Sequence, residues 1–361
     1  MKTGKILICL IVGMVLMILA SCGGSSTPKE QKEAPPMGTK QEQPQVGSGA
    51  QSQYIMRIGH VTSPTGSRHK AALKLAEQVS QKTNGRLKIE VYPAAQLGDN
   101  TQLIQGTQTG TVQGVITPTL FTFAFHELFN VLDLPFLFKD IDQAFKVTQS
   151  PIGDELLASV ESKGFKALAF WPQWLRVVIA RFPADKPENF QGVKFRIMPA
   201  QVVLDEYRGW GASPVPTDLG ELYNSLQQGV VDGANLTLTE IYDFKLNEAA
   251  KYLTLLNDGL LCDVILVNKQ WFDSLPADLQ KVLKDEFKAM ARERLDIERV
   301  GMQERLDKIK AAGKNQVIEL TPEQKKAFVK SVQPTYDALL KRLPEAKSYL
   351  EKIQDELAKE K

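Results

Sequence analysis

The chain has 361 residues and a formal net charge of +2, a balance that gives no support for nucleic-acid binding, which normally leaves a basic surface. Its three cysteines include only one beyond residue 22, Cys262, which we expect to be a small buried hydrophobe outside any disulfide. The length from Tyr54 onward is enough for a large core divided between two lobes.

The N-terminal segment is typical of an export signal. Lys2 and Lys5 precede an apolar run from Ile6 to Ala20, which is short for a helix that spans a bilayer. The run ends in Leu-Ala-Ser-Cys, which resembles the cleavage and lipidation pattern of bacterial lipoproteins. We therefore expect a lipoprotein signal peptide at 1–21 and a lipid on Cys22 that attaches the protein to a membrane; an ordinary cleaved signal peptide is the alternative.

Residues 22–53 follow as a stretch rich in Gly, Ser, Pro, Gln, Lys and Glu, with almost no large apolar side chains. Such a composition buries too little surface to offset the entropy of ordering, so the sequence predicts a disordered tether. About thirty flexible residues have a root-mean-square span on the order of 30 Å.

The next elements alternate between strands and helices. The predicted order is a strand at 54–61, a helix at 68–82, a strand at 87–91, a helix at 100–109 and a strand at 112–117. This order favours an α/β lobe with a largely parallel sheet.

A similar unit follows. Strands are predicted at 166–171, 175–180, 193–198 and 230–236, with a helix at 218–228. From Ala277 to Ala312 the sequence predicts one helix of about 50 Å, with Pro276 before it and Gly313 after it, which is too long for one small lobe. We expect this helix to span both lobes.

The strand "GVKFRIM" raises a question about its arginine. Val193, Phe195 and Ile197 point to one face and Lys194 and Arg196 to the other. Either the second face is simply solvated, or Arg196 points into a cleft and binds an anion. The alternation does not decide between these two interpretations.

Several strings, taken in chain order, resemble the extracytoplasmic solute-binding proteins of tripartite ATP-independent periplasmic (TRAP) transporters. They are "RIGHV", "KTNGRLKIEVYPAAQLGDNTQLIQGTQTG", "LDLPFLFKD", "GVKFRIMPA", "ELYNSLQQGVVDGAN", "KYLTLLN" and "VNKQWFDSLPADLQ". The resemblance covers residues 57–275 and weakens along the long helix.

This resemblance implies a two-lobed α/β fold of the periplasmic-binding-protein type, with a ligand cleft between the lobes. We expect 54–173 plus 262–300 to form the first lobe and 174–261 plus 301–361 the second. It also implies a receptor that closes over a small organic acid and delivers it to the TRAP membrane subunits.

The family motif G-x-K-x-R places Arg196 as the residue that binds the ligand carboxylate, because a planar guanidinium matches two carboxylate oxygens. Arg176 matches a second arginine that the family often carries. The family motif D-G-x-E-N is altered here: Asn235 comes one position early and Leu236 takes the usual place of the asparagine. Either Asn235 substitutes through a local shift, or the site exchanges a polar contact for an apolar one.

The first lobe is expected to supply the other wall of the cleft. The candidates there are His60, Gln96 and Asp99, and Trp174 is a candidate near the two arginines. For each of them a purely structural role is the alternative.

Two other classes of protein are compatible with the lobes. One is the solute-binding protein of an ATP-driven importer, and the other is a ligand-binding sensor lipoprotein. An enzyme is disfavoured, because the chain has no nucleophile elbow, phosphate-binding loop, dinucleotide-binding motif or helical zinc-binding histidine pair. The sequence predicts no metal and no cofactor.

Overall fold

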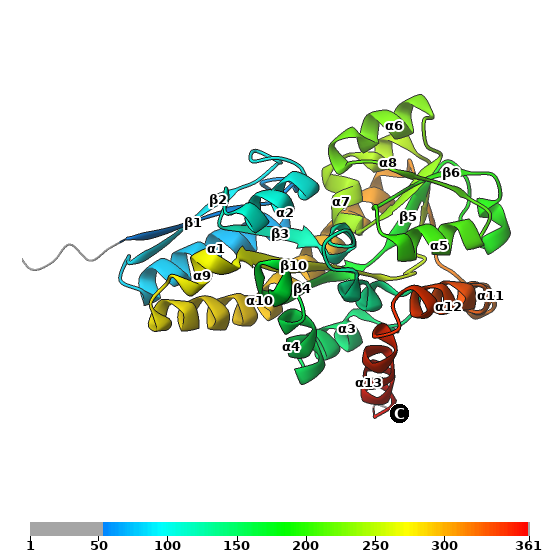
Figure 1. Cartoon of the computed structure of the whole chain (residues 1–361). Helices are drawn as coiled ribbons and strands as arrows, with labels where there is room; N and C mark the ends of the chain where they lie inside the picture. The colour runs from blue at the N-terminus through cyan, green and yellow to red at the C-terminus, as the bar shows by residue number, and fades with distance from the viewer. Residues whose placement is uncertain (1–52, 360–361) are drawn as a thin grey trace, which may run out of the picture. The chain divides into compact units, whose positions relative to one another are not determined.

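The computed structural model describes residues 53–359 (Figure 1). The expected signal peptide, Cys22 and nearly all of the expected tether lie outside the described residues. Among the residues that are described, no helix combines the length and apolar character needed to cross a bilayer.

Two sheets organise the fold, as the α/β expectation required. The first sheet contains, in spatial order, β2 (Leu87–Tyr92), β1 (Tyr54–Gly59), β3 (Gly114–Pro118), β10 (Leu260–Asn268) and β4 (Phe165–Leu175). β1 is parallel to β2 and β3, whereas β10 runs antiparallel to both of its neighbours. This sheet is therefore largely parallel, with one strand reversed near its centre.

The second sheet contains, in spatial order, β11 (Gln316–Ile318), β9 (Tyr252–Thr254), β5 (Val177–Ala180), β8 (Gly233–Leu236), β6 (Lys194–Ile197) and β7 (Ser213–Pro216). β6 is parallel to β7 and β8, and β5 is antiparallel to β8 and β9. We call each sheet with the helices that pack on it the first and the second lobe.

The helices divide between the lobes. Those that follow or cover strands of the first sheet are α1 (Ser67–Lys82), α2 (Asn100–Thr109), α3 (Ile141–Thr148), α4 (Pro151–Ala158) and α9 (Lys269–Asp273). Those of the second lobe are α5 (Gln201–Gly209), α6 (Leu222–Gln228), α7 (Leu238–Asp243) and α8 (Leu246–Ala249). The predicted helix at 218–228 begins with a 3-10 turn at Leu219–Glu221.

The long helix α10 (Ala277–Ala312) has the predicted bounds. Its N-terminal part packs on α1 and β4 of the first lobe, and it also contacts α7 of the second lobe. Leu306 and Ile309 near its end belong to the hydrophobic core of the second sheet. Gly313 ends it in the left-handed conformation, with φ 65°, which glycine adopts without strain.

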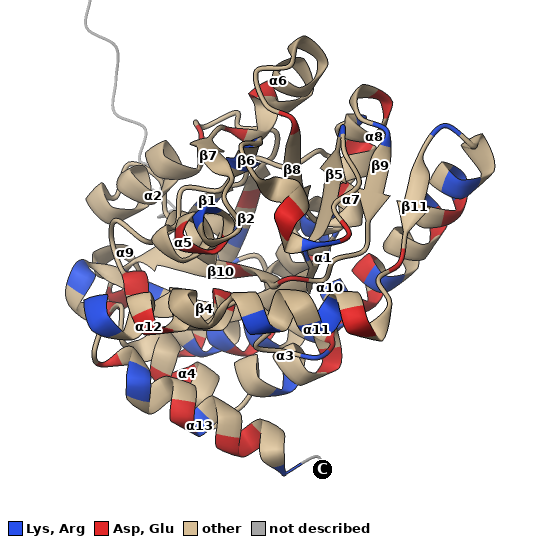
Figure 2. Cartoon of the chain, turned by 90° about the vertical axis from the view of Figure 1, so that its right-hand side faces the viewer, with Lys and Arg blue, Asp and Glu red and all other residues tan. Residues whose placement is uncertain are grey.

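Three helices complete the chain: α11 (Pro322–Ser331), α12 (Gln333–Arg342) and α13 (Ala346–Ala358). α12 packs on α5 of the second lobe, whereas α13 packs on α3 and α4 of the first. The segment expected to belong wholly to the second lobe therefore contacts both. Figure 2 shows acidic and basic residues interspersed along the helices on the face turned toward the viewer, without separation by sign.

The chain passes between the sheets twice close to Arg176. β4 of the first sheet leads directly into β5 of the second, and β9 of the second leads back into β10 of the first. The Arg176 amide donates to the Gly259 carbonyl at 2.8 Å, so the two crossing segments are hydrogen-bonded to each other. One hydrophobic core continues across this junction and includes side chains from both sheets. These crossings set the lobes face to face.

Candidate functional site between the lobes

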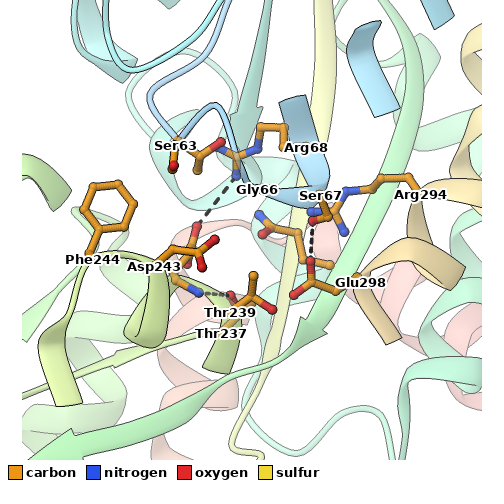
Figure 3. Close-up of a pocket in the computed structure, with 13 residues that line it drawn as sticks. Ser63, Gly66, Ser67, Arg68, Thr237, Thr239, Asp243, Phe244, Arg294 and Glu298 are labelled. Carbon is orange, nitrogen blue, oxygen red and sulfur yellow. Dashed lines mark hydrogen bonds and ion pairs between the residues drawn. The ribbon is translucent and has the colours of Figure 1, made fainter. Parts of the chain in front are cut away.

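Two adjoining cavities are lined by residues of both lobes. The inner cavity is lined in the first lobe by Thr62, Ser63, Gly66, Ser67, Arg68, Gln173, Arg294 and Glu298, and in the second by Thr237, Thr239, Glu240, Asp243 and Phe244 (Figure 3). The centre of a water molecule can occupy about 20 Å³ of this cavity. That volume is room for one or two water-sized groups.

The outer cavity is much larger, at about 420 Å³. Its lining in the first lobe is Val61, Ser63, Pro64, Ala94, Ala95, Asp99 and Asn100, and in the second lobe Asp218, Leu219, Gly220, Asp243 and Phe244. Ser63, Asp243 and Phe244 border both cavities, so the two are neighbours along one cleft.

A hydrogen bond closes the opposite side of the inner cavity. Ser67, the first residue of α1, donates to the Glu298 carboxylate on α10. Beyond these two residues and Thr239 lies an open groove beside the middle of α10. The inner cavity is therefore enclosed on one side by an interaction between two helices of the first lobe.

An ion-pair network forms the floor of the inner cavity. Arg68 makes two hydrogen bonds to the Asp263 carboxylate, at 2.9 and 2.6 Å. Arg294 lies 3.6 Å from the same carboxylate, and Gln173 donates to it at 2.9 Å. Arg68 also lies 4.0 Å from the carboxylate of Glu240 in the second lobe. This network brings charges of both signs to the face where the lobes meet.

Arg196 lies on β6 next to residues of both cavities. Its Nε donates to the Thr217 carbonyl at 2.8 Å, one residue before Asp218 of the outer cavity. Its side chain is 1% exposed, and Nη1 has no hydrogen-bond partner among the described residues. Burial lowers the pKa of Arg196 to about 10, opposed by the negative charges of Glu240 and Asp218. A buried guanidinium with an unpaired donor favours an anionic ligand.

Glu240 on α7 lies between two arginines of opposite lobes. Burial raises the pKa of this carboxyl, whereas the positive charges of Arg68 and Arg196 oppose that rise. Its amide is capped by the Thr237 side chain, which begins α7 and fixes the carboxyl at the cleft. Glu240 therefore interacts electrostatically both with Arg196 and with Arg68 of the ion-pair network below the inner cavity.

Arg176 is placed differently from Arg196. It lies at the crossing between the sheets, fully buried, and its side chain is paired with Asp258 at 3.2 Å and Glu206 at 3.1 Å. Although burial alone would lower the pKa of Arg176, these two carboxylates raise it above its usual value. Neither Arg176 nor Arg196 is among the residues that line the two cavities, but Arg196 adjoins residues that do. The structure thus gives Arg176 internal partners, and its expected contact with ligand stays a prediction.

The altered motif places Leu236 rather than Asn235 on the face of Arg196. Arg196 pairs with Ala234 across β6 and β8, and successive residues of a strand alternate between faces. Leu236 therefore shares the face of Arg196, whereas Asn235 points to the other face. The Asn235 amide is buried there without a partner among the described residues. This arrangement favours the alternative in which an apolar side chain replaces a polar contact.

The remaining predicted residues are spread over several environments. His60 is buried and hydrogen-bonded to His69 and Thr62, at 3.1 Å in each case, and burial with nearby Arg68 lowers its pKa to about 2. Asp99 borders the outer cavity and also caps α2. Gln96 is exposed and Trp174 half-buried, and neither lines the two cavities.

Six charged residues that line the cleft escaped the sequence analysis: Arg68, Asp218, Glu240, Asp243, Arg294 and Glu298. The charged face of an amphipathic helix is normally solvated, and α10 carries many such residues. A signal exists only in Arg294 and Glu298, which are four residues apart and so share one face of α10. Both are almost completely buried. Within the described range, no group of metal-ligating side chains is arranged to hold a metal ion.

Comparison with known proteins gives one consistent family. The model for bacterial extracellular solute-binding proteins, family 7, matches residues 58–343. The C4-dicarboxylate-binding periplasmic protein DctP of Rhodobacter capsulatus is 35% identical over 294 residues, which cover 80% of this chain and 87% of that protein.

Solved structures agree in fold. A TRAP periplasmic solute-binding protein from Desulfovibrio salexigens with bound orotic acid superposes with a TM-score of 0.82 at 32% identity, covering 85% of this chain and 99% of that one. The sugar acid binding protein of Advenella mimigardefordensis in complex with galactonate gives a TM-score of 0.81 at 28% identity, covering 85% of this chain and 99% of that one.

Proposed function

Because the chain belongs to family 7 of the bacterial extracellular solute-binding proteins, we propose that Arg196 binds the carboxylate of a small organic acid in the cleft between its lobes. The observation that carries this proposal is a buried guanidinium with an unpaired Nη1 and no carboxylate partner among the described residues, next to residues that line both cavities. The ligands named for the three relatives differ in size, but each contains a carboxylate. One arginine that binds the carboxylate, surrounded by residues that differ between the proteins, accounts for that pattern.

The protein is a TRAP-type solute-binding receptor, and the family resemblance inferred from the sequence is confirmed. The alternative of an ATP-driven importer is less well supported than the TRAP type. Family members are receptors rather than enzymes, and we propose that this chain acts by binding alone. Its partners are then the TRAP membrane subunits, which receive the acid after capture.

Closure of the lobes is part of the proposal. We assign 54–173 plus 262–300 to the first lobe and 174–261 plus 301–361 to the second, with α13 lying against the first. The inner cavity is too small for a whole organic acid. Ligand therefore enters while the lobes are apart, and hinge motion at the crossing segments brings Arg196 and Arg68 to opposite sides of it.

We further propose that Cys22 carries the lipid that attaches this receptor to a membrane, on the strength of the Leu-Ala-Ser-Cys sequence. Expression of the full chain and of Cys22→Ser, followed by separation of membrane and soluble fractions, tests this. The variant is expected in the soluble fraction. Equal membrane retention of both proteins contradicts the anchor and leaves the ligand proposal untouched.

A thermal-shift screen against organic acids, sugar acids and amino acids tests the binding proposal. A ligand at about a hundred times its dissociation constant adds about 2.7 kcal/mol of stability. For any acid found, Arg196→Ala is expected to weaken binding by about 2–5 kcal/mol, because the carboxylate is left desolvated and unpaired.

Isothermal titration of wild type, Arg196→Ala and Lys194→Ala measures this loss. Lys194 is on the same strand but exposed, so its removal is the matched control and should leave affinity unchanged. Equal affinity of Arg196→Ala and wild type contradicts the carboxylate anchor.

A further inference from the structure

We infer that the inner cavity takes a hydroxyl group at the far end of the ligand, so that the preferred acid is hydroxylated and carries a single carboxylate. The inference rests on the proposed function, in which Arg196 holds the carboxylate end. It concerns four polar residues that line the inner cavity: Arg68, Arg294, Thr239 and Glu298.

Unpaired donors converge on this cavity from the first lobe. Nη1 of Arg68 and both Nε and Nη2 of Arg294 have no hydrogen-bond partner among the described residues. Both side chains are at most 2% exposed. Buried donors of this kind are satisfied by a ligand or by water, so an oxygen acceptor is expected between them.

An unpaired acceptor faces the same space. Ser67 donates to one carboxylate oxygen of Glu298, and the other oxygen, Oε1, has no partner within the described part of the chain. The Thr239 hydroxyl of the second lobe is also buried and unpaired, and it can either donate or accept. Figure 3 shows Thr239 and Glu298 on the same side of the cavity. The missing group must therefore both accept and donate.

Charge and hydrogen-bonding capacity distinguish the three polar groups that an organic acid could present at its far end: a carboxylate, an ammonium and a hydroxyl. The charged residues that line the cavity are three carboxylates and two arginines, so the carboxylates outnumber the arginines: Glu240, Asp243, Glu298, Arg68 and Arg294. A second ligand carboxylate would add to this excess and could donate nothing to Glu298.

An ammonium group can only donate hydrogen bonds, so it would leave the unpaired guanidinium nitrogens without an acceptor. A hydroxyl carries no charge, accepts from an arginine and donates to a carboxylate.

Size agrees with this assignment. The space of about 20 Å³ in the inner cavity holds one or two water-sized groups. The outer cavity, at about 420 Å³, is of the size that accommodates the rest of a small organic acid. Glu240 borders the inner cavity and its charge acts on Arg196, so the inner cavity lies within electrostatic range of the proposed carboxylate-binding residue.

Acids that differ only at the far end test the inference directly. Titration calorimetry of the wild-type protein compares butyrate, 4-hydroxybutyrate, succinate and 4-aminobutyrate at four carbons, and hexanoate, 6-hydroxyhexanoate, adipate and 6-aminohexanoate at six. In whichever series binds, the hydroxylated monocarboxylate is expected to bind about ten- to a hundred-fold more tightly than the unsubstituted acid. It should also exceed the dicarboxylate and the amino acid.

Two substitutions connect that preference to the cavity. Thr239→Val removes the hydroxyl at nearly constant volume and should weaken the hydroxylated acid about ten-fold, without changing the affinity for the unsubstituted acid. Glu298→Gln removes one negative charge and should improve the dicarboxylate about ten-fold relative to the hydroxylated acid. Thr254→Val is the matched control, because its hydroxyl is equally buried and unpaired but lies on β9, outside the cavity.

The outcomes separate this inference from the proposed function. If the dicarboxylate or the amino acid binds best in the wild type, or if Thr239→Val behaves like Thr254→Val, the hydroxyl assignment is wrong and the acid receptor stands. If no acid of either series binds, the proposed function fails and this inference fails with it. A preference for the hydroxylated acid that Thr239→Val removes supports both.

Discussion

Arg176 and Arg196 are both buried, both adjoin strands of the second sheet, and both match arginines of the same family. Arg176 is enclosed by the carboxylates of Glu206 and Asp258, and Tyr207 donates to Asp258 at 2.6 Å. Arg196 has a single backbone acceptor and no carboxylate within ion-pair distance among the described residues. Nη1 of each arginine lacks a hydrogen-bond partner there. The charge of Arg176 is thus neutralised within the fold, whereas that of Arg196 has no directly paired carboxylate.

The difference shows that burial alone does not assign a charged residue to a site. Each charge of a buried ion pair loses its hydration, and the opposite charge of its partner compensates for that loss. Such a pair is therefore compatible with a purely structural role. A buried charge without a partner is costly unless a ligand compensates. What distinguishes the two arginines is therefore the number of carboxylates within reach, which depends on residues far away in the chain.

Replacing Arg176 should produce the largest change in stability. Arg176→Met leaves Glu206 and Asp258 buried without their counter-charge, which typically costs about 3–5 kcal/mol. Urea denaturation of wild type and variant measures the free energy of unfolding. A loss below about 1 kcal/mol would show that this cluster does not hold the crossing segments together, and would reopen a ligand-binding role for Arg176.

A series of stability measurements at different pH values tests Asp133, a buried carboxyl near Arg176. Burial raises the pKa of Asp133 to about 7, and the nearby positive charge of Arg176 opposes that rise. Between a value near 4 in the unfolded chain and about 7 in the folded one, only the folded state holds this proton. Its contribution to stability is therefore complete below pH 4 and falls as pH rises to 7, by up to about 1.4 kcal/mol per pH unit.

Asp133→Asn lacks this proton, so the difference in unfolding free energy between variant and wild type should grow in favour of the variant from pH 4 to pH 7. Denaturation curves at several pH values give that difference. A constant difference over this range contradicts a protonated Asp133 in the folded protein.

The same substitution at Arg196 should have the smallest effect on stability. Arg196→Met removes one hydrogen bond and the cost of burying a charge, two effects of opposite sign, so the free energy of unfolding should change by less than about 1 kcal/mol. Urea denaturation without ligand measures it. A loss as large as that of Arg176→Met would mean that Arg196 stabilises the fold and would remove the contrast between the two arginines.

Local sequence patterns were sufficient for most elements of the fold. The bounds of α2 and α10 agree with the predicted ranges. Pro276 and Gly313 indicated the ends of α10 in the sequence, and the structure adds that Asp99 caps α2. Strand alternation also placed Arg196 and Lys194 on one face, and the structure adds that Arg196 is buried while Lys194 is exposed. Alternation defines a face but carries no information about what covers it.

The composition of the site was harder to predict. Arg68 and Arg294 are separated by more than two hundred positions in sequence and meet only through Asp263 on β10. No local pattern indicates that a lysine- and glutamate-rich helix such as α10 turns Arg294 and Glu298 inward. Likewise, the partners of Arg176 come from α5 and from the segment before β10, so its pairing depends on the tertiary fold.

The position of β10 has a consequence for how the protein must be assembled. This strand is formed by residues 260–268, yet it lies between β3 and β4, which end at residues 118 and 175. β10 is the only strand in the described part of the chain that pairs with the edge strand β4. A ribosome that has made every strand up to β9 has therefore produced β4 without its partner. Bringing β10 back to β3 and β4 closes a long loop, and loops of this kind slow folding. Until β10 arrives, one edge of β3 and both edges of β4 are unpaired, so a truncated chain should be prone to aggregate and should need the protection of a chaperone.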